Sequence, residues 1–172
     1  MRLETERLIL RVPELPDFDA FAAMWADENV NRFISGKTWP RNESWKKFTG
    51  NVGHWALLGY GQWSVLRKDS GEYVGQVGFF DADRDLGPDF DNDREAGWVL
   101  APGADGQGYA TEAMQIAHSW MDKQPFGGRT VCMMDVDYPA SRRVAEKCGY
   151  VEMRRTEDTF GAVVLFERMT SV

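Results

Sequence analysis

The stretch from Glu95 to Ala113 reads EAGWVLAPGADGQGYATEA. Its first six residues have the pattern of a short strand, and the glycine-rich segment 101–108 follows. After this segment, apolar residues recur at the spacing of one helix face, at Ala113, Ile116, Ala117 and Trp120. Backbone N–H groups at the start of a helix can point at an anion without a side chain in the way. The stretch therefore predicts a strand, a loop suited to a phosphate, and a helix.

Known phosphate motifs do not account for this loop. Counted from Gly106, the third small position of a dinucleotide fingerprint falls on Thr111, and no acidic residue ends a second parallel strand at the expected distance. A Lys-Ser/Thr pair, which a nucleoside triphosphate loop needs, is also missing. A glycine turn that only permits tight packing stays open as the alternative.

The composition indicates a folded protein. A chain of 172 residues predicts one domain, spanning 1–172, and 43% hydrophobic with 13% aromatic residues exclude a disordered acidic chain. The net charge of −7 disfavours a nucleic-acid partner and favours cationic partners. Because the sequence has neither a long apolar run nor an apolar start, we expect a cytoplasmic protein without membrane association.

The elements around the loop predict a mixed α/β sheet that is not all parallel. Strand patterns cover 3–12, 60–68, 72–80, 95–100, 130–137, 150–155 and 162–169. Helical patterns begin at Asp17, cover 43–58, follow the glycine loop, and cover 139–148. The segment 81–94, with six aspartates, is expected to be an exposed loop.

Metal chemistry is not expected. Two cysteines cannot supply a disulfide framework or a Cys-rich zinc site, and two histidines leave few nitrogen ligands for any metal. Asp81, Asp83 and Asp85 imitate the start of a calcium loop, but Leu86 replaces the required glycine and Asn92 the final glutamate. We expect Cys132 and Cys148 to be buried hydrophobes, and His54 and His118 to be partly exposed.

The segments 97–102 and 108–113 resemble motif A of the GNAT superfamily of acyl-CoA-dependent N-acetyltransferases. The segments 5–11, 25–30 and 140–150 resemble its RimJ/RimL-type branch, whose founding members acetylate the N-termini of ribosomal proteins. The resemblance spans nearly the whole chain in the right order. It implies a mostly antiparallel sheet with a central splayed pair of parallel strands, flanked by helices, and acetyl-CoA as co-substrate without a metal.

The resemblance also implies which residues bind the cofactor. The backbone N–H groups of Gly106, Gly108 and Ala110 would hold the pyrophosphate, and the strand edge at Trp98 to Leu100 would pair with the pantetheine arm. The full implied set is Trp98, Val99, Leu100, Asp105, Gly106, Gln107, Gly108, Tyr109, Ala110, Thr111, Tyr138, Ser141 and Arg142.

Three positions depart from the pattern of the family. Asp105 stands where the superfamily has Gln or Arg, and an acidic side chain beside a pyrophosphate is unfavourable. Tyr138 replaces an Asn that contacts the pantetheine arm, and Ala145 stands where many relatives have a general-acid Tyr. Ser141 is then the nearest hydroxyl.

Acetyl transfer to an amine needs a base for the ammonium group and a proton for the departing thiolate. Glu95, at the start of the strand before the loop, is the candidate base, directly or through water; the alternative is a solvated strand-end glutamate. Ser141 is the candidate proton donor to the thiolate; the alternative is a serine that only caps a helix.

The expected function is transfer of an acetyl group to a primary amine by direct attack in a ternary complex, with a protein N-terminus as acceptor. One alternative is a small-molecule amine acetyltransferase of the antibiotic or polyamine type. Another is a non-catalytic acyl-CoA-binding module, in which Asp105, Tyr138 and Ala145 mark lost catalysis. Whether the chain acts alone or as a homodimer stays open.

Overall fold

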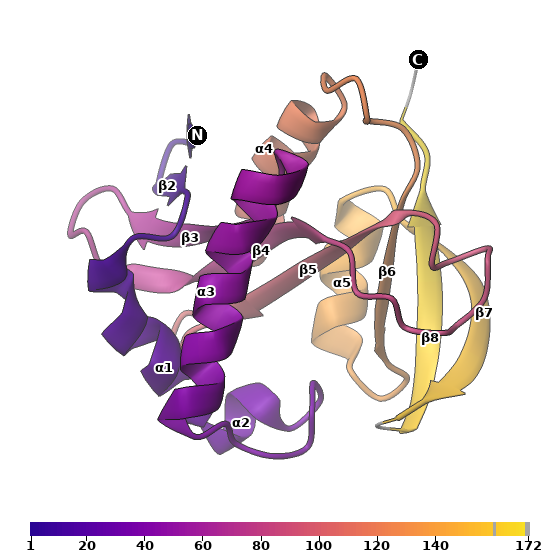
Figure 1. Ribbon diagram of the computed structural model, residues 1–172, viewed down its shortest axis with the longest axis horizontal. Helices are drawn as coiled ribbons and strands as arrows, with labels where there is room; N and C mark the ends of the chain where they lie inside the picture. Colours follow the sequence, from indigo (N-terminus) through magenta and orange to yellow (C-terminus); the bar gives the residue numbers. More distant parts are fainter. Residues whose placement is uncertain (160, 171–172) are drawn as a thin grey trace.

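The computed structural model describes residues 1–159 and 161–170 (Figure 1). The strands are β1 Arg2–Glu4, β2 Leu8–Arg11, β3 Gln62–Arg67, β4 Tyr73–Phe80, β5 Arg94–Leu100, β6 Thr130–Asp135, β7 Val151–Asp158 and β8 Gly161–Arg168. The helices are α1 Phe18–Ala26, α2 Glu28–Asn31, α3 Arg41–Leu58, α4 Tyr109–Met121 and α5 Pro139–Lys147, and a 3-10 turn spans Leu15–Asp17.

One eight-stranded sheet runs through the molecule in the order β1-β2-β3-β4-β5-β6-β8-β7. Neighbouring strands are antiparallel except for β5 and β6, which are parallel. The parallel pair follows from the connection between these strands, because a crossover through α4 returns the chain in the same direction. The expected mixed, mostly antiparallel sheet is confirmed.

The parallel pair separates almost at once. Only Arg94 with Thr130 and Glu95 with Val131 are paired between β5 and β6. Beyond this point β5 stays paired with β4 as far as Leu100, whereas β6 stays paired with β8. The two halves of the sheet therefore diverge at its centre, as the family resemblance implied.

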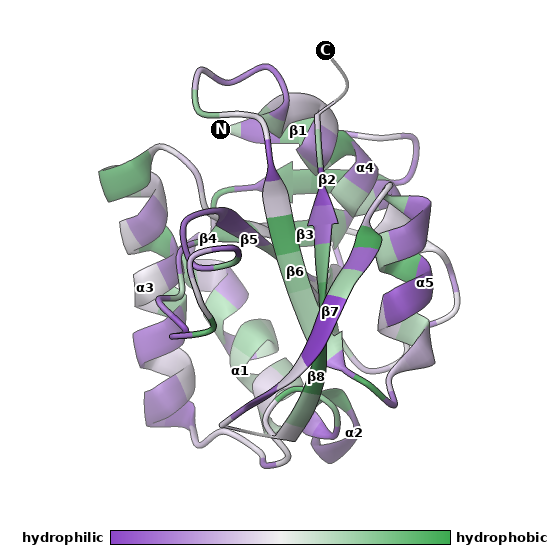
Figure 2. Ribbon diagram, turned by 90° about the vertical axis from the view of Figure 1, so that its right-hand side faces the viewer, coloured by the Kyte–Doolittle hydropathy of each residue, from purple (hydrophilic) through white to green (hydrophobic). Residues whose placement is uncertain are grey.

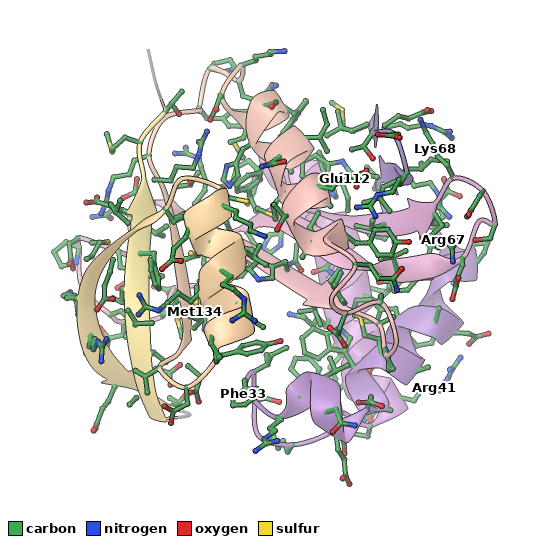
Figure 3. The ribbon with its side chains drawn as sticks, turned by 180° about the vertical axis from the view of Figure 1, so that it is seen from behind. Phe33, Arg41, Arg67, Lys68, Glu112 and Met134 are labelled. Carbon is green, nitrogen blue, oxygen red and sulfur yellow. The ribbon has the colours of Figure 1, made fainter. Side chains whose placement is uncertain are left out.

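Helices cover both faces of the sheet. The α1 to α3 segment lies on one face (Figure 1), and α4 and α5 lie on the other (Figure 3). Strand β6 is hydrophobic along most of its length, whereas the edge strand β7 is largely hydrophilic (Figure 2). The main core packs side chains of α4 against the central strands, including Ala113, Met114, Ala117, Trp63 and Phe79.

The chain start is fastened to the first turn of α4. Glu112 accepts hydrogen bonds from the hydroxyl of Thr5 and from the guanidinium and backbone N–H of Arg7. The Arg7 guanidinium also donates to the carbonyl of Gln107 at 3.0 Å and lies 4.7 Å from the ring centroid of Tyr109. Thr5 and Arg7 are therefore held against the end of the glycine loop and the first turn of α4, although about a hundred residues separate them in the sequence.

The structure differs from the expected elements at two places. The strand expected over 3–12 is two strands, because the chain turns between Thr5 and Leu8. The Thr5 N–H donates to the Leu8 carbonyl at 3.0 Å, and the Leu8 N–H donates to the Thr5 hydroxyl at 2.9 Å. Helix α2 was not expected; Asp27 caps it by accepting from the amides of Asn29 and Val30.

In the part of the chain that the structure describes, no helix has both the length and the apolar character to cross a membrane.

His118 is buried, which corrects the expectation of partial exposure. It is 3% exposed, and its ring packs against the rings of Phe79 and Tyr150. Within the described residues neither ring nitrogen has a hydrogen-bond partner. Burial, together with the nearby charge of Arg168, lowers the pKa of His118 from 6.5 to about 3.

His118 should make the protein less stable in acid. Between pH 6.5 and about pH 3 the unfolded chain binds a proton at this histidine and the folded chain does not. The free energy of unfolding should therefore fall by up to about 1.4 kcal/mol per pH unit in this window. Urea unfolding at a series of pH values measures the slope, and His118→Phe should reduce it. An unchanged slope in a folded variant would contradict the buried neutral ring.

Candidate active site

The glycine loop presents free backbone N–H groups ahead of α4. Gly103, Gly106 and Gly108 have φ angles of +83°, +72° and +80°, which favour glycine, and Gly108 is the N-cap of the helix. Within the described chain, none of the backbone N–H groups of residues 105–110 donates a hydrogen bond. Donors left open at a helix start attract a negative group.

A cavity of about 790 Å³ lies beside these N–H groups, between the loop, β5, α5 and the segment around α2. Of the thirteen residues expected at the cofactor, eleven line it: Trp98, Val99, Leu100, Asp105, Gly106, Gly108, Tyr109, Ala110, Thr111, Tyr138 and Ser141. Gln107 and Arg142 do not. The Gln107 amide donates to the carbonyl of Gly103 at 3.0 Å.

The divergence of the strands exposes one edge of β5 toward this cavity. Ala101 donates its N–H to the carbonyl of Val74 on the β4 side, at 2.7 Å. Because successive residues of a strand direct their backbone groups to opposite edges, those of Trp98 and Leu100 face the gap that β6 leaves. An extended chain with amide groups can pair there as an additional strand would.

Two cations of α5 line the first cavity. Arg143 and Lys147 are both exposed and make no ion pair within the described residues. Arg142, expected at the cofactor, instead bonds Glu152 at 2.8 Å and lies over the ring of Phe166. Consecutive helical residues point in directions about 100° apart, so one of two adjacent arginines faces the cavity. The motif alone did not reveal which one.

Asp105 and Tyr138 lie near each other at the same cavity. Asp105 is exposed and lines this cavity. Burial of Tyr138 raises the pKa of its hydroxyl, and the negative charge of Asp105 raises this pKa further. The Tyr138 ring stacks on Phe33 with centroids 4.6 Å apart, so the start of α5 contacts the segment after α2. Figure 3 shows Phe33 below α5. Both aromatic residues also line a second cavity.

Ser141 lies where the cavities meet. It is 8% exposed, lines both cavities, and accepts a hydrogen bond from the indole N–H of Trp98 at 3.1 Å. Its side chain makes no capping bond to α5, whose N-cap is Tyr138. The capping alternative is therefore not what the structure shows, and the hydroxyl proton of Ser141 is free to be donated.

The second cavity, of about 400 Å³, reaches the first at Trp98, Val99, Ser141, Phe33 and Tyr138. Glu95 lines it and is 5% exposed, so the alternative of a solvated strand-end glutamate is wrong. Both carboxylate oxygens of Glu95 accept from the Arg84 guanidinium, at 2.5 and 2.8 Å. Burial raises the pKa of Glu95 above its ordinary value, against the opposing effect of Arg84.

Lys47 of α3 also lines the second cavity, and no motif or spacing in the sequence pointed to this residue. Its ammonium nitrogen lies 5.1 Å from the ring centroid of Trp25 and 5.4 Å from that of Trp39. Burial, followed by the nearby charge of Arg84, lowers the pKa of Lys47 to about 8. A chain of buried amides completes this wall: Asn51 donates to Gln76 at 3.2 Å, and Gln76 donates to Gln62 at 3.1 Å.

The acidic loop is held by internal contacts. Asp89 pairs with Arg154, Asp93 pairs with Arg129, and Asp81 accepts from the hydroxyl of Tyr60. Among residues 1–159 and 161–170, no group of acidic, cysteine or histidine side chains is arranged to hold a metal ion.

The two cysteines are buried. Burial raises the pKa of both Cys132 and Cys148, as expected for structural thiols.

The sequence belongs to the GNAT acetyltransferases. A family model described as an acetyltransferase (GNAT) domain matches residues 7–151. This match includes the splayed strands, the glycine loop and α5.

Relatives agree with this assignment. The chain is 29% identical over 114 residues to p20 of Bacillus licheniformis, an uncharacterized N-acetyltransferase, and this match covers 66% of the chain and 61% of p20. A Bordetella pertussis protein described as a GNAT-family acetyltransferase superposes with a TM-score of 0.87 and 30% identity, covering 98% of this chain and 99% of the other. RimL, a ribosomal alpha-N-protein acetyltransferase solved with coenzyme A, shares the fold at a TM-score of 0.80 and 16% identity, with 98% of each chain covered.

A side chain at Gly106 should block the anion site. Gly106→Ala places a Cβ where no protein atom lies within 4 Å, so only a ligand on the loop would meet it. Coenzyme A affinity, measured by calorimetry, should fall at least tenfold, or about 1.4 kcal/mol. Gly71→Ala is the matched control, because Gly71 has a φ of +73° and equally open surroundings in the turn between β3 and β4. Equal coenzyme A affinities in the two folded variants would refute the site.

Ser141→Ala should lower kcat more than it raises the KM for acetyl-CoA, because donation to a departing thiolate occurs mainly in the transition state. Trp98→Phe removes the indole N–H that orients the hydroxyl but keeps the hydroxyl, so its effect on kcat should be smaller. Steady-state kinetics of thiol release compares the two variants. A change in KM alone would make Ser141 a residue that only positions the cofactor.

Proposed function

We propose that the chain transfers the acetyl group of acetyl-CoA to a primary amine by direct attack, without a covalent enzyme intermediate. The observation that carries this proposal is the opening between β5 and β6, which leads from the open N–H groups of the glycine loop to Ser141 and Glu95. One ligand with a phosphate end and an extended amide arm fits these features together.

The first cavity suits coenzyme A in charge and in shape. The backbone N–H groups of Gly106, Gly108 and Ala110 would hold its pyrophosphate at the start of α4. Arg143 and Lys147 supply positive charge for the remaining phosphate groups. The free edge at Trp98 and Leu100 would pair with the amides of the pantetheine arm and bring the thioester to the junction of the cavities.

The second cavity suits the acceptor. There the amine nitrogen forms a bond to the thioester carbon and the carbon–sulfur bond breaks, with the backbone N–H groups that face the gap stabilising the oxyanion. Glu95 accepts the proton of the ammonium group, directly or through water. The Ser141 hydroxyl donates its proton to the departing thiolate, and the second proton that the nitrogen loses as the amide forms restores this hydroxyl. Much of the acceleration comes from holding the two reactants in line.

A protein N-terminus is the acceptor that we favour, and the fold shared with RimL supports it. A small-molecule amine is the alternative, since the second cavity has the volume of a small-ligand site. A non-catalytic acyl-CoA-binding module is less well supported, because the Ser141 hydroxyl lies at the junction and the buried Glu95 carboxylate lines the second cavity.

Turnover of acetyl-CoA with panels of peptides and small amines tests the proposal, with thiol release as the measurement. Amine-dependent release that yields the acetylated amine is the expected result. Tight coenzyme A binding without release for any amine would favour the binding module.

Glu95→Gln should reduce kcat/KM by about 10²-fold, the lower end of the contribution of a general base. Arg84→Gln should move the acidic limb of the pH profile to higher pH. Without Arg84 the pKa of Glu95 rises further, and the base is then protonated at a higher pH. Kinetics between pH 5 and 9 measure both effects. If Glu95→Gln kept a normal rate throughout, another group or water would take the proton.

A further inference from the structure

Charged side chains of both signs line the second cavity. Lys47 on α3, Arg32 after α2 and Arg84 are positive, and Glu95, Asp135 at the end of β6 and Asp158 are negative. Arg84 and Glu95 pair with each other. An occupant that carries both a cationic and an anionic group would meet opposite charges in this cavity.

Lys47 is the charge in this cavity that most needs a partner. No carboxylate of the described residues lies within ion-pair distance of it, and the faces of Trp25 and Trp39 supply only part of the stabilisation that an ion pair would give. Arg84 repels it. Glu95 attracts it, but both oxygens of Glu95 are already held by Arg84.

Gln62 adds a neutral donor to the same cavity. It is 4% exposed, and its carbonyl oxygen accepts from Gln76. Its side-chain NH₂ donates no hydrogen bond within the described residues, although the residue lines the cavity. An ammonium group and an amide donor in one small cavity both favour an oxygen acceptor with negative charge.

We propose that the acceptor amine carries a carboxylate, which Lys47 binds. The proposal rests on the function proposed above and specifies its substrate class. The amine of such an acceptor lies at the junction beside Trp98 and Ser141, and its carboxylate lies against the ammonium group of Lys47, on the cavity wall that Trp25 and Trp39 also line. A polyamine, which brings only positive charge, is disfavoured by Lys47.

The carboxylate has two sources, the α-carboxylate of a free amino acid and the side chain of an acidic residue at a peptide N-terminus. Each source has a neutral counterpart of the same shape. Alanine is compared with alaninamide, and a peptide that begins with Asp is compared with the same peptide that begins with Asn. We expect at least a tenfold higher kcat/KM for the charged member of one pair, and the pair identifies the source.

Lys47→Met should abolish this preference, and Lys47→Arg should retain it. Lys46→Met is the matched control, since Lys46 is the adjacent residue of α3, is exposed, and pairs with Glu43 at 2.9 Å. Melting temperatures verify that each variant is folded. Equal rates for the two members of both pairs, or a preference that survives in Lys47→Met, would overturn the proposal.

Binding provides a readout that does not depend on turnover. With coenzyme A present, calorimetry compares N-acetylalanine with N-acetylalaninamide, and the N-acetylated Asp peptide with its Asn counterpart. Tighter binding of a charged product by the wild type, lost in Lys47→Met, supports the carboxylate site even if no transfer is observed. Binding without discrimination overturns it, while the acetyltransferase proposal is judged by turnover alone.

Discussion

The separation of β5 from β6 after Glu95 is the constraint on which the site depends. Buried backbone polar groups normally have partners, yet the edge of β5 at Trp98 and Leu100 loses its neighbour in the middle of the sheet. Continuous pairing with β4 on the other edge keeps this strand in place. The opening is built into the sheet, so strand residues such as Trp98 and Val99 line both cavities where they meet.

Charge is divided between the cavities in a way that the net charge of −7 does not reveal. The first cavity has open backbone donors and two cations of α5 that make no ion pair within the described residues, together with the acidic Asp105. In the second cavity Glu95 and Arg84 hold each other, whereas the ammonium group of Lys47 lies against the rings of Trp25 and Trp39. In the acidic segment 81–94, two of the six aspartates, Asp89 and Asp93, are bound to arginines of the same chain.

Local sequence patterns predicted those elements whose conformation is determined by residues close to one another in the sequence. The glycine loop, α4 and the hairpin of β3 and β4 follow from turn residues and helical spacing, and the resemblance placed them in one fold. The division of the first strand depends on a side-chain bond of Thr5, and the burial of His118 depends on packing against β4 and the segment before β7. Glu95 meets Arg84 through the path of the loop between β4 and β5, and Lys47 meets Trp25 and Trp39 when α1 and α3 pack together. No spacing in the sequence encodes such contacts.

The fastening of the chain start to α4 would give the first residues a part in the proposed binding of coenzyme A. Thr5 and Arg7 touch Glu112, Gln107 and Tyr109 without lining the cavity themselves. Their contacts hold the end of the glycine loop and the first turn of α4 in place, so part of the entropy of ordering that loop is lost during folding and not during binding. The affinity of the proposed phosphate site would then depend partly on the N-terminal arm, and a change there would act on affinity through the unbound state.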